Sequence, residues 1–166
     1  MNVVKERIEI IKAGFDDLEN ILPLYSTLNN YHSENIDDYY KEYTRTKLEK
    51  LILRAINEEK RDMYLAKDDE DNVMGLVEIE YRVIEDHIEL LDKEYIEIKS
   101  LVVGKNYRGK KIGSLLLKFV EDLLEKHDKE YIELKVYGFN DGAIKFYDKN
   151  GYSPFAYYYR KYPSNS

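Results

Sequence analysis

The most constraining feature of this sequence is a regular helical ladder of apolar residues in its second half. Spacings of three and four residues separate Ile112, Leu115, Leu116, Phe119, Val120, Leu123 and Leu124, as on one face of an amphipathic helix. A basic, glycine-containing loop at residues 104–111 precedes the ladder, and an apolar stretch at residues 95–103 precedes the loop. A strand, a loop and a helix in this order predict a domain in which helices pack on a sheet.

The rest of the chain alternates between strand-like and helix-like segments. Further strands are expected at residues 8–11, 63–67, 73–82, 131–137 and 155–162, and helices at 18–28, 36–58 and 141–149. The polar turn at residues 68–72 predicts a hairpin, and Pro23 should kink or shorten the first helix because proline removes a helical donor. With 166 residues the chain fits a single domain spanning residues 1–166.

Composition excludes several classes of function. The net charge of -7 argues against nucleic acid or an anionic membrane as the main partner, because both favour a basic surface. The absence of cysteine excludes disulfides, thiolate metal sites and a cysteine nucleophile, and no other metal-binding pattern is visible. No signal-peptide pattern and no apolar stretch of the roughly 20 residues that span a bilayer is present, so a cytoplasmic location is expected.

The loop before the ladder reverses the sign of the local charge. Lys105, Arg108, Lys110 and Lys111 fall within residues 104–111, and no acid follows until Glu121. Because a helix start offers unpaired N–H groups and a partial positive charge, the loop predicts a pyrophosphate site, against the alternative of a solvated basic turn. Gly109 and Gly113 would let the backbone approach a bulky anion.

Two phosphate-binding patterns compete for this loop. Its glycine and lysine spacing nearly matches the nucleotide P-loop, but Lys111 stands where serine or threonine must hold magnesium. Residues 103–116 instead resemble the acyl-CoA-binding segment of the GNAT acetyltransferases, whose core reads Gln/Arg-x-x-Gly-x-Gly/Ala. Arg108 and Gly113 match its ends, and Lys111 replaces the middle glycine, where a lysine can still adopt helical backbone angles.

A second GNAT signature follows in the correct order and spacing. It comprises Asn140, Ala143, Phe146, Tyr147, Gly151 and Tyr152. The resemblance implies an α/β (α+β) GNAT fold, with a central mixed, mostly antiparallel twisted sheet of about six to seven strands flanked by about four helices. It also implies acetyl-CoA as cofactor, bound by Leu101, Val102, Val103, Arg108, Gly109, Lys110, Lys111, Ile112, Gly113, Ser114, Asn140, Ala143, Phe146 and Tyr147.

The implied chemistry is acetyl transfer to a primary amine. Tyr147 would act as general acid at the sulfur, since a phenol of pKa near 10 stays neutral where a thiol of pKa near 8.5 leaves. The apolar run Leu101-Val102-Val103 breaks strand alternation, as either a β-bulge or a strand buried on both faces would. In the resembling family a bulge here exposes backbone groups to the cofactor, with an N–H as oxyanion donor.

The resemblance favours Glu97 as the base that deprotonates the amine, directly or through water, because it precedes Arg108 by the offset at which some family members carry a catalytic glutamate. Glu78 and Glu80 are alternatives, and each carboxylate is alternatively part of a solvated strand face.

The acceptor is expected to be a small-molecule or peptide amine. In the resembling family its pocket would involve residues 31–43, 87–91 and 157–162. The run Asp37, Asp38, Tyr39, Tyr40 and the separate segment Glu85-Asp86 offer acidic and aromatic groups that suit a cationic amine. The rival interpretation is a non-catalytic acyl-CoA sensor or interaction module with the same fold. Family analogy alone adds a homodimer to the expected assemblies.

Overall fold

The computed structural model describes residues 7–36, 39–41 and 43–163. The chain divides into two compact units, Met1–Lys135 (unit 1) and Val136–Ser166 (unit 2), which are described separately below.

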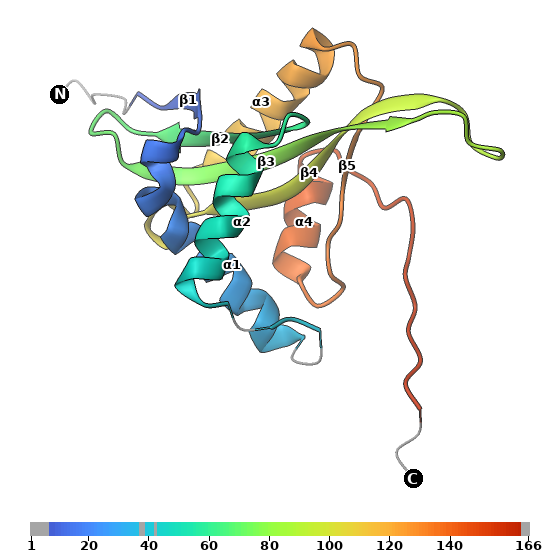
Figure 1. The fold of residues 1–166 in the computed structure, drawn as a ribbon, viewed down its shortest axis with the longest axis horizontal. Helices are drawn as coiled ribbons and strands as arrows, with labels where there is room; N and C mark the ends of the chain where they lie inside the picture. The colour runs from blue at the N-terminus through green and yellow to red at the C-terminus, as the bar shows by residue number, and fades with distance from the viewer. Residues whose placement is uncertain (1–6, 37–38, 42, 164–166) are drawn as a thin grey trace. The chain divides into compact units, whose positions relative to one another are not determined.

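Unit 1 is built on a five-stranded sheet whose strands lie in the order of the sequence (Figure 1). The strands are β1 Glu9–Lys12, β2 Arg61–Lys67, β3 Val73–Ile84, β4 Lys93–Val103 and β5 Ile132–Leu134. Neighbours pair antiparallel from β1 to β4, and β5 lies parallel to β4. The sheet is therefore mixed and mostly antiparallel, as predicted.

The predicted hairpin is the link between β2 and β3. Its turn is held by Asp68, whose Oδ1 accepts hydrogen bonds from the backbone N–H groups of Glu70 and Asn72. A short side-chain acceptor that binds backbone donors two residues or more ahead is typical of an Asx-type turn. The sequence prediction is confirmed here because turn chemistry is local.

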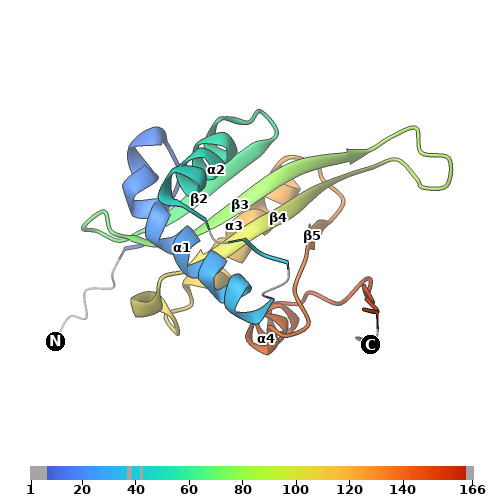
Figure 2. The same ribbon diagram turned by 60° about the horizontal axis from the view of Figure 1, so that its bottom comes forward.

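Three helices cover the two faces of this sheet. Helices α1 (Leu18–Asn35) and α2 (Arg45–Asn57) lie on one face, and α3 (Ile112–Lys126) lies on the other (Figures 1 and 2). Helix α2 begins later than predicted, with Thr44 as its N-cap. Pro23 does not shorten α1, which continues to Asn35 although proline lacks the N–H that would bond to the carbonyl of Glu19.

The main core lies between α1, α2 and the sheet. Its buried members are Ala13, Ile21, Leu22, Leu24, Tyr25, Leu48, Ile52, Ala55, Met63, Leu65, Leu76 and Val102. On the other face the ladder of α3 buries Ile112, Leu116, Val120 and Leu123, which confirms the predicted helix. Not one helix of the described chain has the length and apolar character needed to cross a membrane.

Unit 2 contains the helix α4, Asp141–Lys149, with the predicted bounds. The strand predicted at residues 155–162 is wrong: these residues form neither helix nor strand, and Phe155 and Tyr159 are 93% and 92% exposed. Aromatic residues favour strands, but a strand also needs a hydrogen-bonded neighbour, which local sequence does not supply. The described chain therefore has five strands rather than six or seven, and β5 is shorter than predicted.

Candidate active site

The start of α3 presents a cluster of unsatisfied donors in unit 1. Its N-cap residue, Lys111, makes no side-chain capping bond, and the first turn contains no acid. The N–H groups of Ile112, Gly113 and Ser114 belong to the first turn, which has no intrahelical acceptors for them. A helix start of this kind is suited to an anion, so the pyrophosphate site stays a prediction.

The loop before α3 contributes both charge and an unusual backbone. Lys105, Arg108, Lys110 and Lys111 are all exposed, and no heavy atom lies within 4 Å of a Cβ built on Gly109. Lys111 has φ 64° and ψ 13°, so its helical angles are left-handed, the region that favours glycine. The substitution for the family's middle glycine is therefore accommodated with strain, and the lysine retains the glycine-type conformation.

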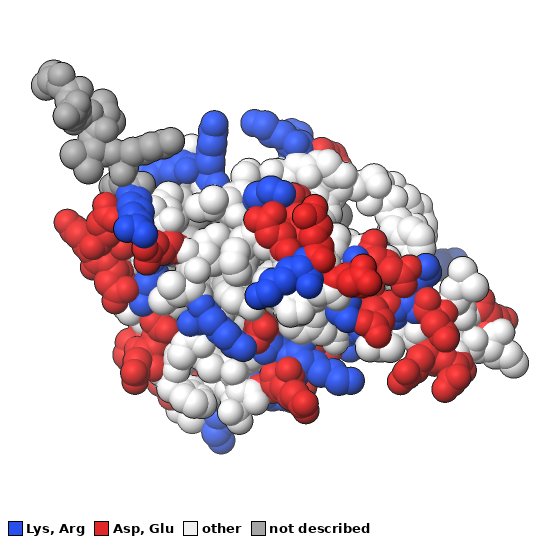
Figure 3. Space-filling model, turned by 90° about the horizontal axis from the view of Figure 1, so that it is seen from above, with Lys and Arg blue, Asp and Glu red and all other residues white. Residues whose placement is uncertain are grey.

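Acidic groups lie closer to this loop than the sequence order indicates. Hydrogen bonds from Asn72 lower the pKa of Asp68, and the charge of Lys110 contributes to the same shift. On the face shown in Figure 3, acidic and basic side chains are interspersed rather than gathered into one basic surface. The cationic character at the start of α3 is therefore a local feature.

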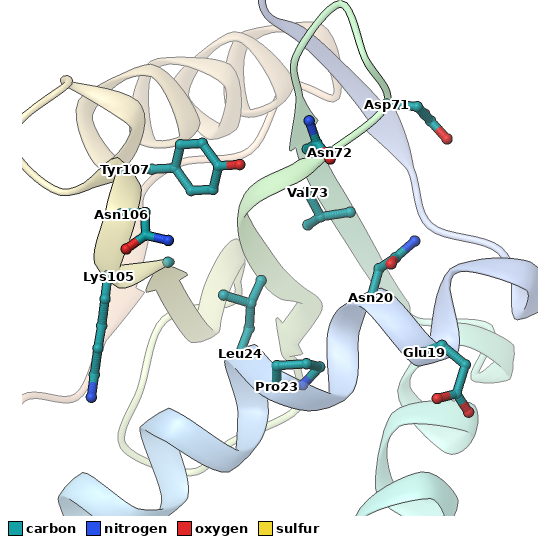
Figure 4. A pocket seen from close by; sticks show the side chains of 11 residues that line it. Glu19, Asn20, Pro23, Leu24, Asp71, Asn72, Val73, Lys105, Asn106 and Tyr107 are labelled. Carbon is teal, nitrogen blue, oxygen red and sulfur yellow. The ribbon is translucent and has the colours of Figure 1, made fainter.

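A pocket of about 340 Å³ adjoins the beginning of the loop (Figure 4). It is lined by Glu19, Asn20, Pro23, Leu24, Asp71, Asn72, Val73, Gly104, Lys105, Asn106 and Tyr107. Two carboxylates and one ammonium group line it, so it suits a phosphate less well than the start of α3 does.

A β-bulge interrupts the pairing of β3 with β4. Glu78 pairs with Ser100 and Ile79 pairs with Ile98, which leaves Lys99 as the extra residue. The predicted position at residues 101–103 is therefore corrected to Lys99. The apolar run has the other cause considered above: Val102 faces the α1–α2 core, while its neighbours face the side covered by α3.

Beyond the bulge, β4 has a strand neighbour on one side only. Its pairing with β5 is restricted to Ile96, Glu97 and Ile98. The Gly104 N–H donates to Met74 O of β3, so by alternation Leu101 and Val103 direct their N–H groups to the opposite side. Within the described residues no strand pairs there, although Arg108 Nε makes a long hydrogen bond of 3.5 Å to Val103 O.

The carboxylate of Glu97 lies among cations. Lys99 Nζ is 2.8 Å from its Oε1, and Arg82 Nε is 3.5 Å from its Oε2. Glu97 lies two residues before Lys99, the extra residue of the bulge, and on the face covered by α1 and α2.

Glu78 and Glu80 lie on the same face. Arg61 Nη1 is 3.6 Å from Glu78 Oε1, and Arg61 Nη2 is 3.3 Å from Glu80 Oε2. Burial would raise the pKa of Glu80, but its hydrogen bond from Arg82 and the nearby cations outweigh burial and lower it. The sequence indicated these carboxylates but not their partner Arg61, because Arg61 lies on β2, far before them in the chain.

Unit 2 holds the second motif, and its residues shape α4. Asn140 caps the helix by accepting the Ala143 N–H at 3.0 Å. The rings of Phe146 and Tyr147 meet edge to face with centroids 5.2 Å apart, and Tyr152 contacts Tyr147 at 5.7 Å. Burial raises the pKa of Tyr147 to about 12.

The segments predicted to contact the acceptor differ in where they lie. Asp37 and Asp38 are outside the described residues, whereas Tyr39 and Tyr40, which follow α1, form an aromatic cluster with His32 of its last turn. Residues 87–91 form the exposed tip of the β3–β4 hairpin, which projects beyond the neighbouring strands (Figure 2). β4 begins at Lys93, six residues before Lys99, so at about 3.3 Å per residue this tip is more than roughly 20 Å from the bulge along the strand. Residues 157–162 belong to unit 2 and are exposed.

Comparison with known proteins shows the family to which this chain belongs. The model of the acetyltransferase (GNAT) family matches residues 25–152, whereas a search of curated proteins found no match. A solved structure of a mutant protein from Bacillus halodurans has a TM-score of 0.86 at 22% identity, over 93% of this chain and 98% of that one.

Two further structures carry acetyltransferase names. One is a possible acetyltransferase from Clostridium difficile, with TM-score 0.73 and 22% identity over 96% of this chain and 99% of that one. The other is an aminoglycoside antibiotic 6'-N-acetyltransferase from Acinetobacter baumannii, with TM-score 0.71 and 15% identity over 95% of this chain and 100% of that one. These likenesses show the fold, and the family match covers most of the chain: the protein is an acetyltransferase that belongs to the GNAT family.

Proposed function

We propose that the protein transfers an acetyl group from acetyl-CoA to a primary amine of a small molecule or peptide. The observation that carries the proposal is the arrangement at the end of β4. At this end the outer edge of the strand pairs with no described strand, the strand runs into a cationic loop, and three N–H groups follow at the start of α3. A pyrophosphate joined to an extended, amide-bearing arm has the matching chemistry.

The residues of unit 1 would hold the cofactor. Arg108, Lys110 and the N–H groups of Ile112, Gly113 and Ser114 would bind the pyrophosphate, with Lys111 and Gly109 shaping the loop. Leu101 and Val103 would pair with the pantetheine amides as a neighbouring strand does, with Val102 anchoring the strand in the core. One of these N–H groups would stabilise negative charge on the acetyl oxygen.

Acetyl-CoA supplies the activated acetyl group as a thioester. Tyr147 would donate a proton to the departing sulfur, and its raised pKa of about 12 keeps the phenol protonated at neutral pH. Asn140, Ala143 and Phe146 would position the arm and the tyrosine ring. Glu97, directly or through water, would accept a proton from the amine as the new C–N bond forms.

A cationic acceptor is favoured by the carboxylates of β3 and β4 and by the aromatic cluster after α1. The test is a panel of cationic, neutral and acidic amines; acetylation of neutral or acidic amines alone would contradict this choice.

The ion pairs of Glu97 favour one alternative, a non-catalytic acyl-CoA sensor, because both carboxylate oxygens already have cationic neighbours. Two measurements separate the two functions. Thermal stability should rise with acetyl-CoA and not with ATP and magnesium, since a ligand that binds only the native state stabilises it. A sensor would pass this test but would release no CoA with any amine in the panel.

Tyr147→Phe tests the enzyme directly, with Tyr152→Phe as the matched tyrosine of the same unit. The first variant should retain acetyl-CoA binding and lose acetyl transfer by about 10²–10⁴-fold, the usual contribution of a general acid. Equal losses in both variants would remove the assigned role from Tyr147.

A further inference from the structure

A buried chain of polar side chains leads from α1 through β3 to the bulge of β4. Tyr25 of α1 is 4% exposed, and its hydroxyl donates to Oε2 of Glu78, which is 5% exposed. The Ser100 side chain acts on the same Tyr25 hydroxyl and lowers its pKa. Since Glu78 pairs with Ser100 across the two strands, the three side chains meet beside Lys99, the extra residue of the bulge.

Ser100 forms the accessible end of this chain. It is half-buried, whereas Tyr25 and Glu78 are fully buried. The residue that follows it, Leu101, directs its N–H to the unpaired side of β4, where the acetyl group would be bound. The exposed end of the chain therefore lies next to the proposed position of the reaction.

Charged groups surround Glu78 from each element packed against it. Arg61 of β2 approaches Glu78 Oε1 and also lies 3.2 Å from Glu58, which follows α2. Glu80 is the next residue of β3 on this face, and Lys99 of β4 is 3.7 Å from it. From α1 the contact is the uncharged Tyr25.

The environment keeps Tyr25 protonated. Burial is the largest cause that raises the pKa of Tyr25 well above its ordinary value, and the negative charge of Glu78 adds to it. The Ser100 side chain acts in the opposite direction and lowers the pKa. Because the phenolate is disfavoured, Tyr25 can pass a proton to Glu78 only while it receives one from Ser100.

We propose that Ser100, Tyr25 and Glu78 form a proton relay that removes the first proton of the acceptor ammonium. The proposal rests on the proposed function. An ammonium N–H proton moves to Ser100 Oγ, the Ser100 proton to Tyr25 Oη, and the Tyr25 proton to Glu78 Oε2. These transfers leave a neutral amine and a neutral Glu78 carboxyl group.

The relay and Glu97 handle different protons. An alkylammonium loses two N–H protons when it becomes an amide: one before its lone pair can attack, and one as the C–N bond forms. The relay takes the first and later releases it to solvent, while Glu97 takes the second. The sulfur gains one proton from Tyr147, so the reaction releases one proton overall.

The decisive test is the pH dependence of kcat/KM with 1,5-diaminopentane as probe. At pH 7 only about one in 10³ of such amines is neutral without help, given a pKa near 10.4. Glu78→Gln, Tyr25→Phe and Ser100→Ala should each lower the rate at pH 7 by about 10²–10³-fold. Their rates should then rise tenfold per pH unit, because only the amine that is already neutral reacts.

Non-additivity and a matched control separate a relay from a packing defect. The double variant Tyr25→Phe/Glu78→Gln should be no slower than either single variant, since one break stops the whole chain. Tyr64→Phe, a tyrosine on the opposite face that hydrogen-bonds Asp62, should keep the wild-type profile. Losses that are equal at every pH would overturn the relay and leave the acetyltransferase function standing.

A second readout does not depend on turnover. In the wild type, the proton of Tyr25 Oη should give a low-field NMR resonance that exchanges slowly, because this hydroxyl is buried and bonded to a carboxylate. Glu78→Gln should shift it upfield, Ser100→Ala should shift it, and Tyr64→Phe should leave it unchanged. If no such resonance belongs to Tyr25, the relay is overturned. A wild type that binds acetyl-CoA but releases no CoA with any amine overturns the proposed function and the relay together.

Discussion

The two faces of the sheet in unit 1 follow the same strands but differ in chemistry. Toward α3, the buried strand residues include Val77, Ile79, Ile96 and Ile98, all apolar. Toward α1 and α2, the sheet is apolar near Met63 and Leu76 and becomes charged around the bulge. One face is therefore a continuous core, and the other combines a core with a polar site.

This difference indicates where stability and function are separated. Apolar burial stabilises a fold without loss of hydration of charged groups. Half-buried carboxylates and cations lose hydration energy, and only well-formed ion pairs compensate for that loss. A charged cluster that persists at such a cost is a candidate for chemistry. We therefore expect variants on the α3 face to lower stability and variants beside the bulge to lower activity.

The largest expected effect is on the charged face. Glu97→Gln should lower kcat by about 10²–10⁴-fold, as the loss of a general base does. The free energy of unfolding should change by less than about 1 kcal/mol, because its ion pairs are partly exposed. The control is Glu94→Gln on the same strand, whose carboxylate binds Lys129. Equal losses of activity in the two variants would contradict a specific role of Glu97 in the reaction.

On the α3 face, Leu116→Ala should lower the free energy of unfolding by about 2–5 kcal/mol, the cost of a core cavity. Urea denaturation measures this loss, and Leu115→Ala, at a position 39% exposed on the same helix, provides the control. Activity per folded molecule should stay near the wild-type value. A selective loss of activity in the folded Leu116 variant would show that the α3 face also serves the reaction.

The loop at the end of β4 should affect binding rather than stability. Arg108→Ala should raise the Kd for acetyl-CoA by about 10- to 100-fold, because a charge-assisted contact contributes roughly 1.5–3 kcal/mol. Calorimetric titration gives the Kd, with Lys118→Ala on the exposed side of α3 as the control. Equal affinities of the two variants for acetyl-CoA would contradict the assignment of pyrophosphate binding to this loop.

The smallest effect concerns backbone strain at the same loop. Lys111→Gly should raise the free energy of unfolding by about 0.5–1 kcal/mol, because the left-handed backbone costs a lysine roughly 1–2 kcal/mol and glycine loses part of that gain as chain entropy. Thermal melting detects the change. Lys110→Gly, at a neighbouring lysine without positive φ, should not stabilise, and a gain from both variants would contradict the assignment of strain to residue 111.

Local signals predicted much of the fold. The ladder of α3, the short helix α4 and the β2–β3 hairpin depend on periodicity, caps and turn residues within a few positions of each other, so their sequence alone indicates them. The cationic loop was likewise visible, because its charges are adjacent in the chain. The GNAT motifs at Arg108 and Asn140 indicated the family for the same reason.

The sequence by itself thus determined the presence and order of the helices, the hairpin, the cationic loop and the family. Only the tertiary structure decided the placement of the bulge at Lys99, the lack of strand structure at residues 155–162 and the left-handed backbone of Lys111. It also revealed that Tyr25 of α1 bonds to Glu78 of β3. Strand pairing and buried polar contacts join residues far apart in the chain, and their energies depend on neighbours that no local pattern specifies.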